Sequence, residues 1–139
     1  MTVRALVLVT LAAVGLAAPA PVAAQHPHGQ HMTDLTLNQG ARWATDAPLR
    51  EAMDALRTAA AGPVEALPEQ IDVQVDYMIA HCQLPPDADA QLHIVIERLV
   101  EAADRMRAGA QAEGREEVIA ALNAYGAHFD HPGWTPISG

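Results

Sequence analysis

The sequence predicts an all-α protein that folds as an up-down-up-down antiparallel four-helix bundle. Four segments carry apolar side chains at helical spacing, and short connections containing proline or glycine separate them. No segment shows the strict apolar and polar alternation that is typical of a half-buried strand. The alternative is a looser array of three helices with a docked N-terminal arm.

The first helix is expected to begin at Thr45-Asp46 and to end at Gly62-Pro63. Thr and Asp are good N-caps, and Pro48 falls in the first turn, where its missing N–H costs nothing. Glycine followed by proline is a typical helix end. The predicted inward face consists of Leu49, Met53, Leu56 and Ala60.

The second helix is expected to start around Leu67-Pro68 and to stop at Pro85-Pro86. The apolar spacing continues to the last turn of this segment, so Cys82 is predicted to lie on the buried side of the helix. The face consists of Ile71, Val75, Met78 and Cys82.

The third helix opens at Asp87, and the fourth lies beyond a turn that Gly109 and Gly114 are expected to bracket. Trp134, after the last helix, is expected to fold back on the end of the bundle. The third helix carries Leu92, Ile96, Leu99, Ala103 and Met106 on one face, and the fourth carries Val118, Leu122, Tyr125 and Phe129.

Residues 1–24 are predicted to be a secretory signal peptide that is cleaved after Ala24. Arg4 precedes an apolar run of about fourteen residues, which is shorter than the roughly twenty that span a bilayer, so a membrane anchor is disfavoured. The mature protein is expected in the periplasm. Residues 25–42 are interpreted as a flexible arm, whose His26, His28 and His31 could collect metal ions weakly, and residues 43–139 as the bundle domain.

Composition narrows the possible partners. Cleavage removes Arg4, the only charged residue before position 25, so seventeen acidic residues against seven arginines give the mature chain a charge of −10. This balance, with no lysine, argues against nucleic acid and membrane surfaces and is compatible with cations. One cysteine cannot form an internal disulfide, so Cys82 is free, metal-bound or paired with another chain. The sequence is compatible with a monomer and with a homodimer.

A candidate metal site follows from aligning the four helices by height. At about 1.5 Å per residue, polar or polarisable side chains from every helix reach one layer near the Pro85-Pro86 end. Thiolate, thioether and imidazole are the donors that select Cu(I), then Zn(II) or a haem iron. The predicted ligands are Cys82, Met53, His93 and Met78. Taken singly, each of these residues also has an ordinary packing or boundary interpretation.

Two other assignments remain open. The first is a bundle that binds haem b through Met53 and either His93 or His128; the absence of a CxxCH motif argues against covalent haem c. The second is a metal-free interaction module, dimeric through Cys82. His81 is a reserve ligand expected to point away from Cys82. With one serine, no phosphate loop and no HExxH motif, we expect no enzyme activity.

Several segments resemble a group of small exported proteobacterial helical proteins of the DnrO-like kind. They are Trp43–Arg50 with Met53, Cys82–Pro86 with Leu92-His93, and Tyr125-Gly126 with Phe129–Trp134. The resemblance extends over nearly all of the chain from Leu37 onward. It implies export and a His-rich arm, but it implies no activity. The shared layer of soft donor side chains leads us to expect a periplasmic protein that handles, stores or delivers copper, preferably Cu(I), with a metal-donor or metal-acceptor protein as a possible partner.

Overall fold

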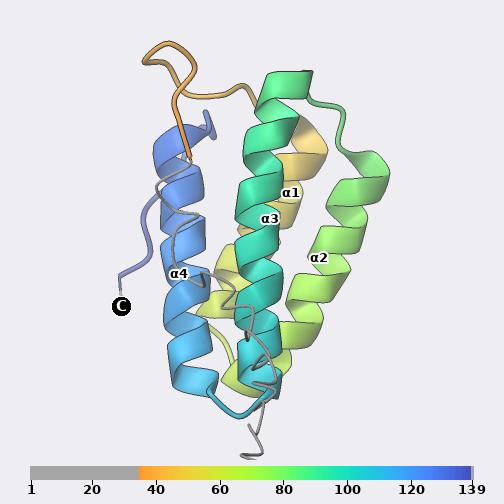
Figure 1. Cartoon of the computed structure of the whole chain (residues 1–139), viewed down its shortest axis with the longest axis vertical. Helices are drawn as coiled ribbons and strands as arrows, with labels where there is room; N and C mark the ends of the chain where they lie inside the picture. The colour runs from red at the N-terminus through yellow and green to blue at the C-terminus, as the bar shows by residue number, and fades with distance from the viewer. Residues whose placement is uncertain (1–34, 139) are drawn as a thin grey trace, which may run out of the picture.

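A computed structural model describes residues 35–138, and in that part of the chain it contains four α-helices and no strand. They are α1 (Ala47–Ala60), α2 (Leu67–His81), α3 (Pro86–Arg107) and α4 (Gln111–His128), with a short 3-10 helix, η2 (Val64–Ala66), before α2. Each α-helix packs on the next, and α4 returns to α1 (Figure 1). The predicted all-α four-helix fold is confirmed. The predicted signal peptide and the histidines of the arm lie outside the described residues.

The helix boundaries follow from local chemistry that the sequence displays. Asp46 caps α1, because its Oδ1 accepts the Leu49 N–H at 3.0 Å. Proline occupies the first turn of α1, α2 and α3, where a backbone N–H would have no helical acceptor. Gly109, with φ of +104°, makes the turn between α3 and α4.

The core is formed by the inward faces of the four helices. All of the predicted stripe residues are buried except Ile96, which packs at the edge of the core, and Cys82, which is half-buried. The largest fully buried side chains include Leu49, Leu56, Ile71, Leu99, Leu122, Tyr125 and Phe129. No helix among the described residues is long and apolar enough to cross a membrane.

Gly114 corrects one prediction about the chain. We expected it to bracket the turn before the fourth helix, but it lies inside α4 and is buried against α3. A Cβ built on Gly114 would come within 2.8 Å of the Ala102 carbonyl oxygen and 2.4 Å of Met106 Cγ. Glycine is therefore present because α3 and α4 approach closely, and not because the helix breaks there.

The segment after α4, residues 129–138, runs back along the outside of that helix (Figure 1), and we call it the C-terminal strap. Trp134 packs directly on Gly126, as expected for a tryptophan that folds back. Farther along, the Asn123 side chain donates to the Ile137 carbonyl at 3.0 Å and accepts the Ile137 N–H at 2.8 Å. The strap is thus held against α4 by the packing of the Trp134 ring and by two hydrogen bonds between the Asn123 side chain and the backbone of Ile137.

Candidate metal pocket

A pocket of about 240 Å³ lies between the C-terminal end of α2 and the N-terminal half of α3. Three of the four predicted ligands, Met78, Cys82 and His93, line it. The other lining residues are Ile79, Asp89, Leu92 and Ile96. The predicted turn at Pro85-Pro86 therefore brings side chains from two neighbouring helices to one cavity.

Cys82 sits at the point where α2 ends. Its N–H donates to the Met78 carbonyl at 2.9 Å, while its own backbone is already extended, with φ of −71° and ψ of 140°. This makes Cys82 the C-cap of α2. Because the chain leaves the helix here, the side chain is half-buried and reaches the pocket.

Asp46 connects the start of α1 to the end of α2. Its Oδ1 caps α1, and its Oδ2 accepts the Gln83 N–H at 2.7 Å. The same carboxylate accepts a hydrogen bond from the Cys82 thiol. Burial raises the pKa of Cys82 to about 11, and the negative charges of Asp46 and Asp89 and the hydrogen bond to Asp46 add to this effect. The thiol is therefore protonated at neutral pH.

His93 lines the pocket from α3 and is held by the turn of helix before it. Its Nδ1 lies 2.9 Å from the Asp89 carbonyl oxygen, which can only accept, so Nδ1 carries the proton. The Nε2 lone pair is then available to a metal ion, in the arrangement common for metal-binding histidines. The side chain is 65% exposed and lines the pocket with its Nδ1 held by the Asp89 carbonyl.

The remaining predicted ligands lie elsewhere. Met53 is fully buried in the core and does not line the pocket. His81 is exposed, and its ring lies 4.6 Å from that of Tyr77, so it also stays outside the pocket, as expected. His128 directs Nδ1 to the Ala124 carbonyl at 2.8 Å. Within residues 35–138, no three side chains of the His, Cys, Asp and Glu types form a group that could hold a metal ion.

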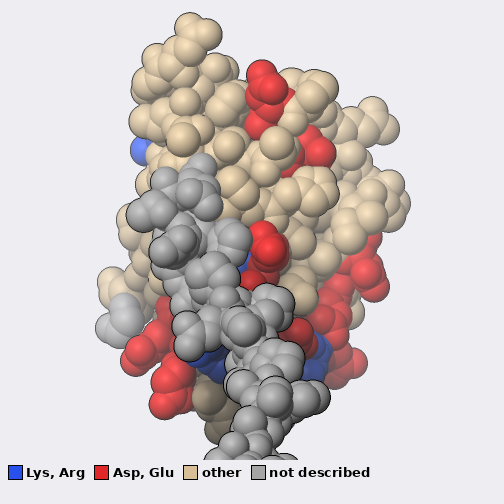
Figure 2. Space-filling view, in the orientation of Figure 1, with Lys and Arg blue, Asp and Glu red and all other residues tan. Residues whose placement is uncertain are grey.

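Two carboxylates lie close to the pocket. Asp89 lines it, and Asp87 shares the first turn of α3 with Asp89. Figure 2 shows a patch of acidic surface near the end where α3 begins, and further acidic patches over the opposite half of the molecule. Negative charge beside the pocket favours the approach of cations.

A second cluster of polar side chains was not anticipated from the sequence. His131, only 6% exposed, lies 3.0 Å through Nδ1 from the Tyr125 hydroxyl and 3.4 Å through Nε2 from Asp54 Oδ2. Burial raises the pKa of Tyr125, and the negative charge of Asp54 adds to the effect. Local sequence spacing gives no sign of this contact, since Asp54 and His131 are far apart in the chain.

The raised pKa of Cys82 predicts that its thiol reacts slowly in the folded protein. In the unfolded chain the thiol ionises from about pH 8.5, but in the folded chain it holds its proton to about pH 11. Iodoacetamide should therefore react at pH 8 at least about tenfold more slowly with the folded chain than with the urea-unfolded chain.

The same raised pKa makes the free energy of unfolding depend on pH. The contribution of Cys82 to stability is complete below about pH 8.5 and is lost as the pH rises toward 11, because only the unfolded state releases the proton in that range. The free energy of unfolding should fall less steeply across this range in Cys82→Ser than in the wild type. Equal slopes in urea titrations of the two proteins would contradict the assignment.

Comparison with known proteins returned no match: no family model, no curated protein and no solved structure is similar to this sequence. The resemblance to exported DnrO-like proteins accordingly stays a prediction.

Proposed function

We propose that this chain is a periplasmic copper-binding protein that takes up Cu(I) in the pocket between α2 and α3, for handling, storage or delivery of the metal. The observation that carries the proposal is the convergence of Cys82, Met78 and His93 on one small cavity. In this proposal the protein acts by binding the metal ion, and we assign it no catalytic step.

The donor set suits a soft monovalent ion. A cysteine sulfur, a methionine sulfur and an imidazole nitrogen are the ligands that favour Cu(I), which accepts low coordination numbers. Leu92 and Ile96 supply apolar walls, and Ile79 also lines the pocket but is 69% exposed. Asp89 would hold the His93 ring through its carbonyl oxygen and so act outside the ligand set.

The size of the pocket argues for an ion over a macrocycle. A cavity of about 240 Å³ is smaller than the roughly 300–1,000 Å³ of pockets that enclose drug-sized organic ligands. Met53, one of the two axial residues considered for haem b, is buried away from this cavity. Haem binding would still be recognised at once by a Soret band in haem-reconstituted protein.

The proposal is tested by anaerobic Cu(I) titration of the chain from Gln25 onward against a chromophoric competitor strong enough to suppress binding by the His-rich arm. Cys82→Ser should weaken Cu(I) binding by at least about a hundredfold, and Met78→Leu and His93→Gln by about tenfold each. Met53→Leu is the matched control, because it changes a methionine outside the pocket, and it should leave the affinity unaltered. An unchanged stoichiometry and affinity in Cys82→Ser would contradict the proposal.

The affinity should also depend on pH with a definite sign. A metal ion bound to the Cys82 sulfur displaces the thiol proton, so binding competes with protonation below pH 11. Apparent Cu(I) affinity should rise about tenfold per pH unit between pH 6 and 8 if this thiol is the only group that releases a proton. A flat profile would show that Cys82 is not a ligand.

A further inference from the structure

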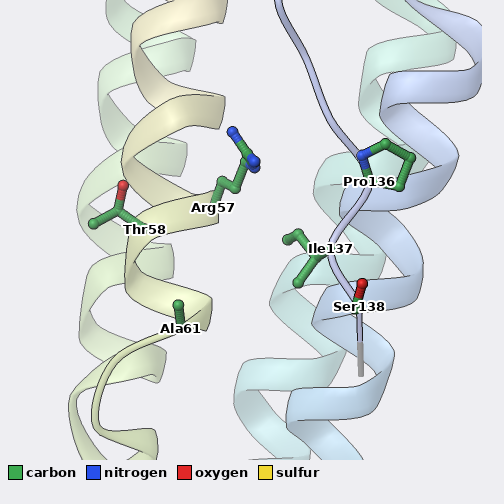
Figure 3. Close-up of a pocket in the computed structure, with 6 residues that line it drawn as sticks. All are labelled: Arg57, Thr58, Ala61, Pro136, Ile137 and Ser138. Carbon is green, nitrogen blue, oxygen red and sulfur yellow. The ribbon is translucent and has the colours of Figure 1, made fainter.

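We infer that the space between α1 and the C-terminal strap is a binding site for a small aliphatic monocarboxylate. A pocket of about 460 Å³ lies there, lined by Arg57, Thr58, Ala61, Pro136, Ile137 and Ser138. Figure 3 shows Arg57 reaching from α1 toward the strap, with Pro136, Ile137 and Ser138 on the opposite wall. The inference is independent of copper binding, since this site shares no residue with the metal pocket.

Contacts with the strap hold the guanidinium of Arg57 in place. Its Cζ lies 5.6 Å from the centroid of the Trp134 ring, and its Nη2 donates to the Thr135 hydroxyl. Trp134 is itself seated against Gly126, and the Asn123 side chain holds the backbone of Ile137. The arginine and the opposite wall are therefore pre-organised before any ligand arrives, which lowers the entropy cost of binding.

The positive charge of Arg57 is not neutralised by the protein within the described residues. No ion pair joins Arg57 to a carboxylate between residues 35 and 138, and no acidic side chain lines the pocket. Asp54, one turn earlier on α1, directs its Oδ2 to His131 at 3.4 Å. A fixed guanidinium with free N–H groups is well suited to a carboxylate, which it can bind through two parallel hydrogen bonds.

The other lining groups narrow the ligand class. The Ser138 hydroxyl can donate to the same anion, whereas the Thr58 hydroxyl already donates to the Asp54 carbonyl at 2.9 Å. Ala61, Pro136 and Ile137 offer apolar surface for a short hydrocarbon chain. A single positive charge in a protein of net charge −9 suits a monoanion better than the phosphate dianion.

The test is an NMR titration of the metal-free chain from Gln25 onward with acetate, butyrate and inorganic phosphate at constant ionic strength. Butyrate should produce saturable shifts in the Trp134 indole N–H and the Arg57 Nε–H resonances. It should bind more tightly than acetate, by up to about fourfold for each buried methylene group. Arg57→Gln should lower the butyrate affinity at least about tenfold, and Arg42→Gln, a matched charge change at an exposed arginine outside the pocket, should not.

Three outcomes of the titrations of the wild type and Arg57→Gln would overturn the inference. They are linear, non-saturating shifts with butyrate, butyrate affinity that survives Arg57→Gln, and phosphate binding at least as tight as butyrate binding. A second variant, Ile137→Ala, removes part of the apolar wall without touching the charge. It should reduce the preference for butyrate over acetate, and an unchanged preference would also overturn the inference.

Discussion

Gly114→Ala should lower the free energy of unfolding by about 2 kcal/mol, even though alanine is the better helix former. The new methyl group would lie 2.8 Å from the Ala102 carbonyl oxygen and 3.3 Å from the Met106 backbone nitrogen of α3. These are backbone atoms, so relief requires α3 and α4 to separate. Chemical denaturation followed by circular dichroism measures the effect.

Two further variants sharpen the Gly114 experiment. Glu113→Ala changes the neighbouring exposed residue of α4 and should alter stability by less than about 0.5 kcal/mol. Adding Met106→Ala to Gly114→Ala removes the side-chain contact at 2.4 Å but leaves the carbonyl contact. If Gly114→Ala no longer lowers the free energy of unfolding in the Met106→Ala background, the helix backbones do not limit this position.

Gly126→Ala should expel Trp134 from its seat on α4. The added Cβ would come within 2.1 Å of Trp134 Nε1 and 2.2 Å of Cδ1, distances that no small adjustment relieves. We expect the free energy of unfolding to fall by about 2 kcal/mol. We also expect a red shift of Trp134 fluorescence in a Trp43→Phe background and faster proteolysis within the C-terminal strap. The carboxylate site should be lost together with the ring contact to Arg57.

A double-mutant cycle separates the clash at Gly126 from other effects. In a Trp134→Ala background the clash is absent, so Gly126→Ala should stabilise the protein by a fraction of 1 kcal/mol through helix propensity. If Gly126→Ala destabilises the Trp134→Ala protein as much as the wild type, the contact between the ring and Gly126 is not the cause.

The sequence was sufficient to predict the helices wherever their ends depend on local chemistry. Asp46, the first-turn prolines and the break at Pro85-Pro86 act within a few residues of themselves, and the observed boundaries follow them. Gly114 was misread because its local signal, a low helix propensity, is the same whether it ends a helix or admits a neighbouring one. The packing of α3 that distinguishes these cases is not local.

The level of each candidate ligand along its helix could be predicted from the sequence. The direction in which each side chain points around the helix axis could not be predicted in every case. Aligning antiparallel helices brought Met78, Cys82 and His93 to one level, and all three line one pocket. Met53 is buried in the core outside that pocket, a difference that depends on how α1 is rotated against its neighbours. The contacts of His131 with Asp54 and Tyr125 depend on the path of the C-terminal strap, which periodicity does not describe.

The most direct test of copper binding at this pocket is X-ray absorption spectroscopy of the anaerobic Cu(I)-loaded chain. The proposal predicts sulfur and nitrogen neighbours around copper, with fewer sulfur neighbours in Met78→Leu and an unaltered spectrum in Met53→Leu. A first shell of nitrogen and oxygen alone, or a spectrum of Cys82→Ser identical to that of the wild type, would contradict it.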